Sequence, residues 1–406
     1  MRECLKKTKR HRGSYKRVPL LWCLVFHLVF NYRILYRITE HWETCKITGT
    51  EFGIDLNSWN TGEKFCGVKL IPPGLHFVYY SSVHLPTRTT APRTGWFHNF
   101  GRGELIVKRW SPEGEEVVDS TEDEVERVKA DLRGIDCRLG SYPYNTWSKW
   151  ISLSNKVTEA TVNRLEPMGG KICSVADLVP SPSSSSSPPS TTSSPCLPNM
   201  VHRPGTAIRY TFLDGRKFPE GSTAAQITLH SLDHSFQLTS LLTTIGKLFT
   251  DQVSGGSMGH SLERELLAEL QFAFLAFLVG QNYDSFEQWK RLVVLLCSCD
   301  QGILDHPALF KDFLGDLYFQ MKEVPRDFFV DIVSSSNFLC SSLHTLFTNI
   351  KDSANVCPEL KERSRKFEAN VTKRFGWDFS REEAEEEPLV VEPQLPTVLL
   401  SSELSE

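Results

Sequence analysis

Residues 269–297 read ELQFAFLAFLVGQNYDSFEQWKRLVVLLC and decide the fold of the second half of the chain. Apolar residues recur here every three or four positions, the spacing that places them on one face of a helix. Gly280 closes the first stripe, so a loop of only a few residues leads to the second. The stripes are Leu262, Leu266, Leu270, Phe274 and Phe277 or Leu278, then Phe286, Trp289, Leu292, Val293 and Leu296. We predict two antiparallel helices with buried apolar faces.

The same periodicity continues through most of residues 203–380 and predicts an all-α helical bundle. Pro307 stands at an early helical position, where its missing N–H costs little. Gly376 is placed to end the last helix. The further helices are expected from residue 307 onward and at 325–333, 338–350 and 359–375.

Residues 50–179 open with short apolar runs and turn residues that are typical of β-structure. GVKL at 67–70 and LHFVYY at 75–80 flank Pro73 and Gly74, which predicts two strands around a type II turn. In the second strand, Leu75, Phe77 and Tyr79 are expected on one face. ELIVKRW at 104–110 and the pair at 117–118 predict a second hairpin.

Two helices are expected after these strands. Thr121 and Glu124 form a capping-box pattern, and Gly134 is the predicted end of that helix. Trp147, Trp150 and Ile151 place the next helix. The predicted fold class is therefore α+β, with a β-rich, sandwich-like N-terminal domain and an all-α C-terminal domain.

A segment rich in serine and proline separates the two predicted domains. Of residues 180–198, seventeen are Ser, Pro or Thr, so the segment has almost nothing to bury. Such a composition predicts a disordered linker, which we place at 180–202.

Charge is concentrated at the two ends of the 406-residue chain, whose net charge is only −4. Residues 1–20 hold eight Lys or Arg and one Glu, whereas residues 381–406 hold one Arg and eight Glu. The body between them is nearly neutral, which argues against an unaided nucleic-acid binder. The eleven cysteines are odd in number and scattered, which fits a reducing cytosolic or nuclear compartment.

The first 49 residues admit two interpretations. A basic run at 2–17 precedes the apolar run VPLLWCLVFHLVF at 18–30, which resembles a secretory signal or membrane anchor. No small-x-small cleavage site follows, and thirteen apolar residues fall short of the roughly 20 that span a membrane. The alternatives are a membrane-associated or secreted protein, and an atypical N-terminus from an alternative or mispredicted exon.

Candidate catalytic and metal-binding residues are few. His230 and His234 stand four residues apart and could share a metal on a helix, but Ser231 occupies the position where a zincin has Glu. Cys297 and Cys299 fit better as small buried hydrophobes than as a redox or metal site. The run 361–374, with six Lys or Arg and two Glu, fits a solvated helix face. We predict no catalytic residue, cofactor or metal.

The acidic tail at 381–406 carries a β-prone segment, PLVVEPQLPTVLLSS at 388–402. Its prolines prevent a self-sufficient strand, yet it could add to the exposed sheet edge of a partner. A plain disordered tail is the alternative. The candidate partner-binding residues are Leu389, Val390, Val391, Val398, Leu399 and Leu400.

Eight stretches, in order from about residue 50 to 379, resemble one family. In the first half they are EFGID at 51–55 with Trp59, GVKLIPPGLHFVYYSS at 67–82, LGSYPY at 139–144 and WISLSNKVTEATV at 150–162. In the second half they are FPEG at 218–221, ITLHSLDHS at 227–235, the opening stretch at 269–297 and DFFVDIVSSSNFL at 327–339. The chain resembles the AAR-two (A1-alpha-two repression) splicing-factor family.

The resemblance implies a noncatalytic assembly factor of the U5 small nuclear ribonucleoprotein (U5 snRNP) that works in cytoplasm and nucleus. Members of the family bind the central scaffold protein of U5 through its RNase-H-like and Jab/MPN-like domains. They keep the spliceosomal RNA helicase and RNA off the scaffold until they leave after nuclear import. A C-terminal tail that pairs as a strand between partner domains is a family feature, and residues 388–402 resemble it.

The N-terminus departs from the family pattern. Members open with a short helical segment and a first strand that leads directly into the GTEFGID-like stretch, and residues 1–49 show neither pattern. Either another segment replaces that first strand, or an edge of the sheet and part of the core lose their cover.

Overall fold

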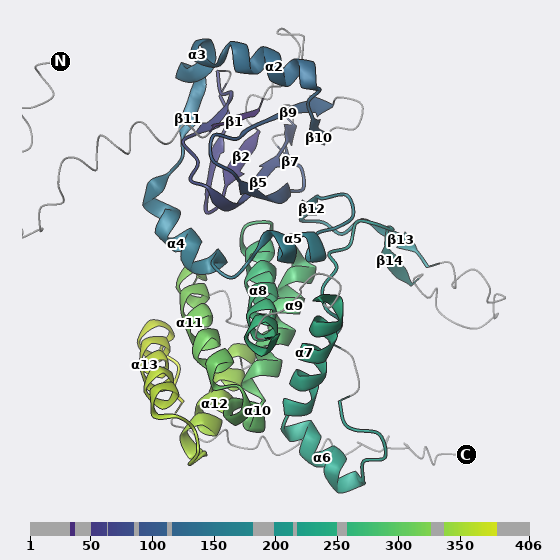
Figure 1. Ribbon diagram of the computed structural model, residues 1–406, viewed down its shortest axis with the longest axis vertical. Helices are drawn as coiled ribbons and strands as arrows, with labels where there is room; N and C mark the ends of the chain where they lie inside the picture. The colour runs from purple at the N-terminus through teal and green to yellow at the C-terminus, as the bar shows by residue number, and fades with distance from the viewer. Residues whose placement is uncertain are drawn as a thin grey trace, which may run out of the picture.

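The computed structural model describes a β-rich unit stacked on the end of a helical unit (Figure 1). The described residues are 33–36, 50–62, 64–84, 89–111, 116–181, 199–213, 217–249, 258–325 and 337–379. The two units correspond to the predicted β-rich and all-α parts, so the predicted α+β fold class is confirmed.

Two five-stranded sheets build the N-terminal unit. In order across the first sheet lie β10 (Glu116–Asp119), β9 (Leu105–Ser111), β1 (Arg33–Tyr36), β4 (Gly67–Lys69) and β11 (Leu139–Ser141). Across the second lie β12 (Ile172–Cys173), β8 (Thr94–Phe100), β5 (Gly74–Ser81), β2 (Glu51–Ile54) and β3 (Asn57–Asn60). A separate small ladder pairs β6 (Val83–His84) with β7 (Thr89–Thr90).

Strand β5 separates two hydrophobic cores. Val78 and Tyr80 join the core between the sheets, together with Ile54, Val68 and other buried residues. The opposite face of β5 carries Phe77 and Tyr79, which pack into the core of the helical unit with the partly buried Leu75. The predicted common face of Leu75, Phe77 and Tyr79 is thus confirmed, and it is the face that contacts the helices.

The predicted hairpin of residues 67–80 is wrong, because β4 and β5 belong to different sheets. Leu70 adopts a left-handed φ of 63° and Ile71 is fully buried, so the chain crosses from one sheet to the other. Pro72 and Pro73 cannot donate hydrogen bonds to a ladder, and Gly74 takes the predicted positive φ, at 129°. The second predicted hairpin is confirmed, since β9 and β10 pair antiparallel.

Residues 33–36 correct the expectation that the N-terminus supplies no strand. They form β1, which pairs antiparallel with β4 and parallel with β9 at the centre of the first sheet. Of the two alternatives for the missing family strand, the structure therefore shows a replacement. The basic run and the apolar run upstream lie outside the described residues.

The helices of the N-terminal unit are α2 (Glu122–Ala130), α3 (Leu132–Ile135), α4 (Tyr144–Ser154) and α5 (Glu159–Leu165), with a 3-10 turn at Asp136–Arg138. The capping box of Thr121 and Glu124 is confirmed. The predicted end at Gly134 is wrong, because α2 ends at Ala130 with Asp131 as its cap. Gly134 lies inside α3, where a Cβ would meet the Asp131 carboxylate.

Eight helices are described in the C-terminal unit. They are α6 (Ala224–Leu232), α7 (Ser235–Phe249), α8 (Met258–Leu278), α9 (Tyr283–Cys297), α10 (Asp300–Asp305), α11 (Pro307–Glu323), α12 (Phe338–Asp352) and α13 (Pro358–Phe375). The predicted helices at 307, 338–350 and 359–375 are confirmed, and Gly376 ends α13 with a φ of 76°. The predicted helix at 325–333 falls almost wholly outside the described residues.

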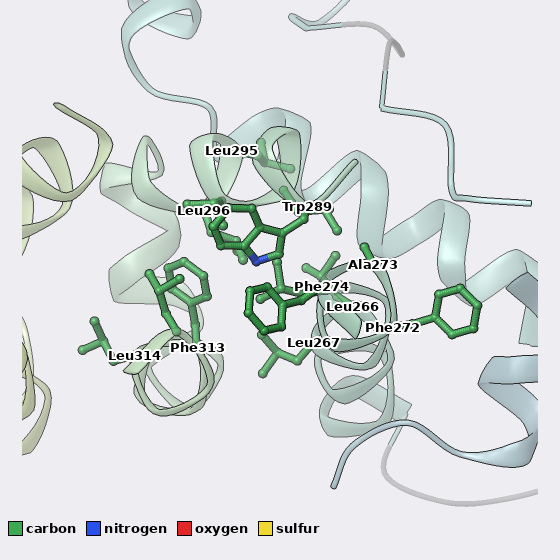
Figure 2. Close-up of a cluster of buried hydrophobic side chains, with 14 of the residues drawn as sticks. Leu266, Leu267, Phe272, Ala273, Phe274, Trp289, Leu295, Leu296, Phe313 and Leu314 are labelled. Carbon is green, nitrogen blue, oxygen red and sulfur yellow. The ribbon is translucent and has the colours of Figure 1, made fainter. Parts of the chain in front are cut away.

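Helix α8 lies at the centre of the helical core (Figure 2). It packs against α9, as the opening stretch predicts, and also against α4, α5, α7 and α11. Phe274 of α8 and Trp289 of α9 place their ring centroids 5.6 Å apart. The buried Trp289 indole N–H donates to Gln320 Oε1 of α11 at 2.9 Å, so this polar group has a hydrogen-bond partner inside the aromatic core.

The ends of the Ser/Pro-rich segment pair with each other. Strand β13 (Leu178–Pro180) runs antiparallel to β14 (Met200–His202), while residues 182–198 between them lie outside the described residues. Arg203 strengthens this ribbon through Asp177, with Nε 2.6 Å from Oδ2. Among the residues that the structure describes, no helix is both long and apolar enough to cross a membrane.

Candidate interaction surfaces

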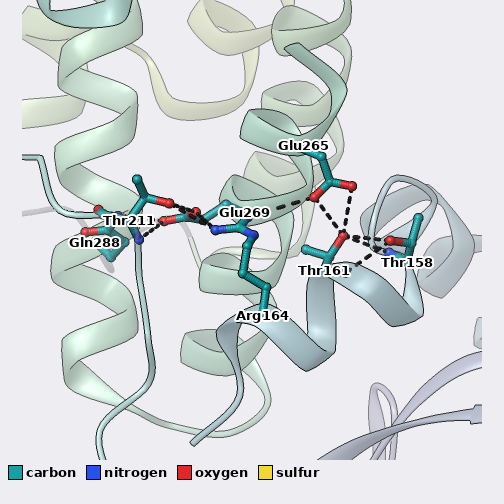
Figure 3. A network of polar contacts seen from close by, with 7 residues as sticks. All are labelled: Thr158, Thr161, Arg164, Thr211, Glu265, Glu269 and Gln288. Carbon is teal, nitrogen blue, oxygen red and sulfur yellow. Dashed lines mark hydrogen bonds and ion pairs between the residues drawn. The ribbon is translucent and has the colours of Figure 1, made fainter. Parts of the chain in front are cut away.

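A buried network of charged and polar groups joins the two units (Figure 3). Arg164 of α5 donates from Nη1 to Glu269 of α8 at 2.8 Å, and the Glu269 side chain is fully buried. Glu269 also accepts from the backbone N and the hydroxyl of Thr211 and from Gln288. A buried charge that is paired and fully hydrogen-bonded is tolerated, whereas an unpaired one is not.

One turn earlier on α8, Glu265 extends this network. Its carboxylate accepts from the Thr161 hydroxyl of α5 at 3.1 Å and lies 3.9 Å from Arg164 Nη2. Burial raises the pKa of Glu265, while the bond from Thr161 and the charge of Arg164 oppose that shift. The carboxylates of Glu265 and Glu269 on α8 therefore both contact α5 of the N-terminal unit.

A second buried pair lies on the other side of α8. Lys156, just after α4, places Nζ 2.6 Å from Asp316 Oδ1 of α11, and both side chains are at least nine-tenths buried. Gln271 of α8 donates to the same oxygen at 3.1 Å. Burial raises the pKa of Asp316 to about 6, although the Lys156 charge lowers it. With the Arg164 network, this pair fixes the two units as one body.

An exposed apolar surface lies on α4, the helix of the N-terminal unit that packs against α8 and α11. Tyr144, Trp147 and Ile151 lie at helical spacing on α4 and are 46%, 39% and 39% exposed. Lys149 of the same helix lies 3.2 Å from Glu323 of α11. We call the three apolar residues the junction surface. Clustered exposed aromatic residues of this kind mark protein interaction sites.

Helix α6 presents a second group of exposed apolar residues. None of its nine residues is buried, and Leu229 and Leu232 are 65% and 73% exposed. A capping box of Thr223 and Gln226 stabilises the helix at its start. It extends from the far end of the helical unit (Figure 1).

The predicted partner-binding residues lie in the tail, outside the described residues. They are Leu389, Val390, Val391, Val398, Leu399 and Leu400. The structure therefore leaves their role as a prediction.

His230 and His234 do not share a helix face. His230 lies in α6, but the extended backbone of Asp233 ends that helix, and His234 precedes α7. The Asp233 carboxylate instead accepts from Ser235 N at 3.0 Å and Asp300 N at 3.0 Å, which joins α7 to α10. Within the described ranges, no group of three or more His, Cys, Asp or Glu is arranged to hold a metal ion.

Cys297 and Cys299 are both fully buried, as small hydrophobes are expected to be. Burial raises the pKa of each thiol above its usual range, which disfavours the reactive thiolate. The described cysteines are all free thiols.

Sequence reasoning missed the polar network and the junction surface. A charged pair at i and i+4, Glu265 and Glu269, interrupts the otherwise apolar stripe of α8, and this pattern marks buried carboxylates that need partners. Nothing local identifies Arg164 as the partner, because it lies 105 residues away in the sequence. The spacing of Trp147 and Ile151 predicts a helix, and the same spacing places both side chains on one apolar face.

Comparisons with known proteins support both units. Residues 47–167 match the family described as "AAR2 N-terminal domain", and residues 210–380 match "AAR2 C-terminal repeat region". The chain is 42% identical to "Protein AAR2 homolog" of Homo sapiens over 362 residues, 85% of this chain and 91% of the relative. The protein of the same name from Caenorhabditis elegans is 38% identical over 340 residues, 82% of this chain and 92% of the relative.

Proposed function

Because this chain belongs to the AAR2 family, we propose that it is a splicing-related, noncatalytic assembly factor of the U5 snRNP. In this proposal it binds the central U5 scaffold protein through the RNase-H-like and Jab/MPN-like domains of that protein. While bound, it excludes the spliceosomal RNA helicase and RNA from the scaffold, and it is released in the nucleus. It therefore works in both cytoplasm and nucleus.

The junction surface is the observation that carries this proposal. Its residues lie on α4, which packs against α8 and α11 of the helical unit, and the two buried charge networks hold the two units in a fixed arrangement. A preorganised surface loses little conformational entropy on binding, so a modest apolar area gives useful affinity. The mechanism is steric, since one rigid body placed on the scaffold covers the sites that other ligands use.

The tail adds a second contact in this proposal. Its β-prone segment at 388–402 pairs as a strand with an exposed sheet edge of the scaffold. The apolar side chains that the isolated segment cannot bury are then covered together with its backbone groups. Two linked contacts on one partner strengthen each other through effective concentration.

Affinity purification from cytoplasmic and nuclear extracts, followed by mass spectrometry, tests the function. We expect the U5 scaffold and other U5 proteins to be recovered without the helicase. With purified proteins, increasing amounts of the chain are expected to displace the helicase from the scaffold. Recovery of the helicase in the same particle, or simultaneous binding of both proteins, would refute steric exclusion.

A surface variant makes this test specific. Trp147→Ala is expected to weaken binding to the scaffold about tenfold or more, as loss of an aromatic hot spot does. Met168→Ala is the matched control, because Met168 is 82% exposed and lies outside the junction surface. If the two variants bind the scaffold with equal affinity, the junction surface is not part of the interface.

The location of the protein in the cell distinguishes the proposed function from the alternative of a membrane-associated or secreted protein. A fluorescent protein fused to the C-terminus is expected in cytoplasm and nucleus. Endoplasmic-reticulum retention, or cleavage near residue 35, would support the alternative. Such a cleavage would cut within β1, whose pairing with β4 and β9 argues against it.

A further inference from the structure

A groove of about 300 Å³ lies between α11 and α13. Tyr318, Met321 and Phe367 are among its apolar lining residues. Lys322, Lys373 and Arg374 are its charged lining residues, and no carboxylate lines it. We call this the basic groove. Its composition suits a ligand that combines negative charge with short apolar groups.

The cations of the basic groove lack carboxylate partners among the described residues. Lys322 Nζ lies 4.1 Å from the centre of the Tyr318 ring. Arg374 Nη2 donates to the backbone carbonyl oxygens of Lys322 and Val324 at 2.7 and 3.1 Å, while its buried Nε has no hydrogen-bond partner in the described part of the chain. Backbone carbonyls fix the guanidinium but leave its charge uncompensated.

The first half of α13 differs, because Arg363, Arg365 and Lys366 each lie within 4 Å of a carboxylate. Glu359 lies 3.0 Å from Lys311, and Glu362 lies 2.9 Å from Arg365 and 3.3 Å from Lys366. Among the described residues, Lys373 and Arg374 at the C-terminal end of α13 and the neighbouring Lys322 of α11 therefore form a cluster of positive charge with no carboxylate lining the groove. Such a local surplus attracts an acidic segment.

The chain leaves α13 close to this groove. Gly376 reverses the backbone, and the Trp377 ring stacks on Phe375 with centroids 4.7 Å apart. Phe379 then packs on Phe347 at 5.1 Å, and Phe347 also contacts Phe367 of the groove at 5.9 Å. The last described residue therefore shares a side-chain neighbour with the groove wall. Three residues later begins the run EEAEEE at 382–387.

We propose that the basic groove binds the acidic run 382–387 of its own chain. Five glutamates supply the carboxylates that Lys322, Lys373 and Arg374 lack, and Ala384 supplies a small apolar group. Individual surface ion pairs are weak, at most about 1 kcal/mol each. The short tether compensates, since it holds the run at an effective concentration of roughly millimolar.

This docking gives the segment at 388–402 a defined starting point beside the helical unit. A second copy of the chain is the competing occupant, because its acidic run has the same sequence. A tethered run reaches the groove at any protein dilution, whereas a second copy does so only at high concentration. The two occupants therefore differ in their concentration dependence.

Zero-length carbodiimide coupling of the full chain, read by peptide mass spectrometry, tests the proposal. We expect amide bonds from Lys322 or Lys373 to glutamates at 382–387, with a yield that does not change on dilution. Lys366, which is 69% exposed on the same helix, is the internal control for mere proximity and should couple at least about fivefold less. At about 1 M salt, where charges are screened within roughly 3 Å, coupling should fall to that control level.

Charge-reversal variants distinguish a loss of docking from a loss of folding. Lys322→Glu with Lys373→Glu is expected to abolish the coupling, and adding Glu385→Lys with Glu386→Lys is expected to restore it with the charges exchanged. The matched control Lys366→Glu should leave coupling at Lys373 unchanged. Coupling no greater than at Lys366, links that form only between two copies, or no recovery in the exchanged variant would overturn the proposal. No partner protein takes part, so this result is independent of the proposed function.

Discussion

The Asp55 carboxylate and the His76 ring lie 2.7 Å apart, Oδ2 to Nδ1, and both side chains are at most 1% exposed. His76 Nε2 donates to the carbonyl oxygen of Pro72 at 2.9 Å, and Asp55 also accepts from Tyr142 and from Phe77 N. This cluster fixes the crossover between the sheets, because it holds the Pro72 carbonyl, the start of β5 and the segment after β11 together.

Removing one donor from this cluster is expected to destabilise the protein. Tyr142→Phe deletes the hydroxyl that donates to Asp55 Oδ2 at 2.6 Å, and should lower the free energy of unfolding by about 1–3 kcal/mol. Tyr144→Phe is the control, because its hydroxyl bonds the Leu70 carbonyl at the exposed surface and should matter less. Urea unfolding of both variants measures the difference. Equal losses of unfolding free energy would contradict a special stabilising role for the buried Tyr142 hydroxyl.

Close packing at Gly53 gives a second prediction. A Cβ at this position would overlap the Tyr79 ring, which packs against the adjacent strand. Gly53→Ala should therefore lower the free energy of unfolding by about 1–3 kcal/mol through overpacking. At Gly62 no atom lies within 4 Å of the equivalent Cβ, so Gly62→Ala should be nearly neutral. A neutral Gly53→Ala in the same unfolding assay would show that Tyr79 can move aside.

The link between the units predicts a large effect at Glu269. Glu269→Gln leaves the Arg164 charge buried beside a neutral amide, and should cost about 3 kcal/mol of unfolding free energy. Glu126→Gln is the matched control, because Glu126 pairs with Lys129 at the exposed surface and its loss should cost less than about 1 kcal/mol. Chemical denaturation of both variants provides the comparison. If Glu269→Gln lowers the unfolding free energy no more than Glu126→Gln does, the buried network does not link the two units.

Asp316 makes stability depend on pH. Its folded pKa, about 6, lies above the unfolded value, so the folded state holds the proton longer as the pH rises. Stability from this group is present at acidic pH and is lost as the pH rises through about 6. The unfolding free energy of Asp316→Asn, relative to the native chain, should thus increase by up to about 3 kcal/mol between about pH 4 and pH 7.

A constant difference between Asp316→Asn and the native chain across this pH range would show that Asp316 titrates alike in the folded and unfolded states.

The central place of β1 gives a fifth prediction. Leu35→Pro removes a backbone donor from a strand paired on both sides, and should destabilise the protein by about 3 kcal/mol or more. Leu35→Ile keeps the donor and the strand preference, so it is the control. Thermal unfolding measures both variants. An unchanged melting temperature for Leu35→Pro would mean that the sheet does not need this strand.

Local patterns in the sequence predicted most of the elements correctly. The apolar stripes at 262–278 and 286–296 lie within α8 and α9, and Pro307 and Gly376 mark helix ends as expected. These features depend on residues only a few positions apart, so periodicity and capping chemistry suffice to find them.

Long-range relationships could not be predicted in the same way. The turn residues at 72–74 indicate a change of direction, but they do not specify whether the next strand returns to the same sheet or crosses to another. Strand β1 follows an apolar run whose composition dominates the local pattern, and its partners lie more than 30 residues downstream. The Arg164 and Glu269 pair likewise depends on how two units meet.

The ribbon of β13 and β14 has a practical consequence for protein engineering. Because it pairs the two ends of residues 182–198, the spacing between the flanking parts is set by the ribbon and not by the length of that segment. The entropy of closing a loop grows only slowly with its length. This position should therefore accept an inserted epitope or reporter domain while both units keep their arrangement.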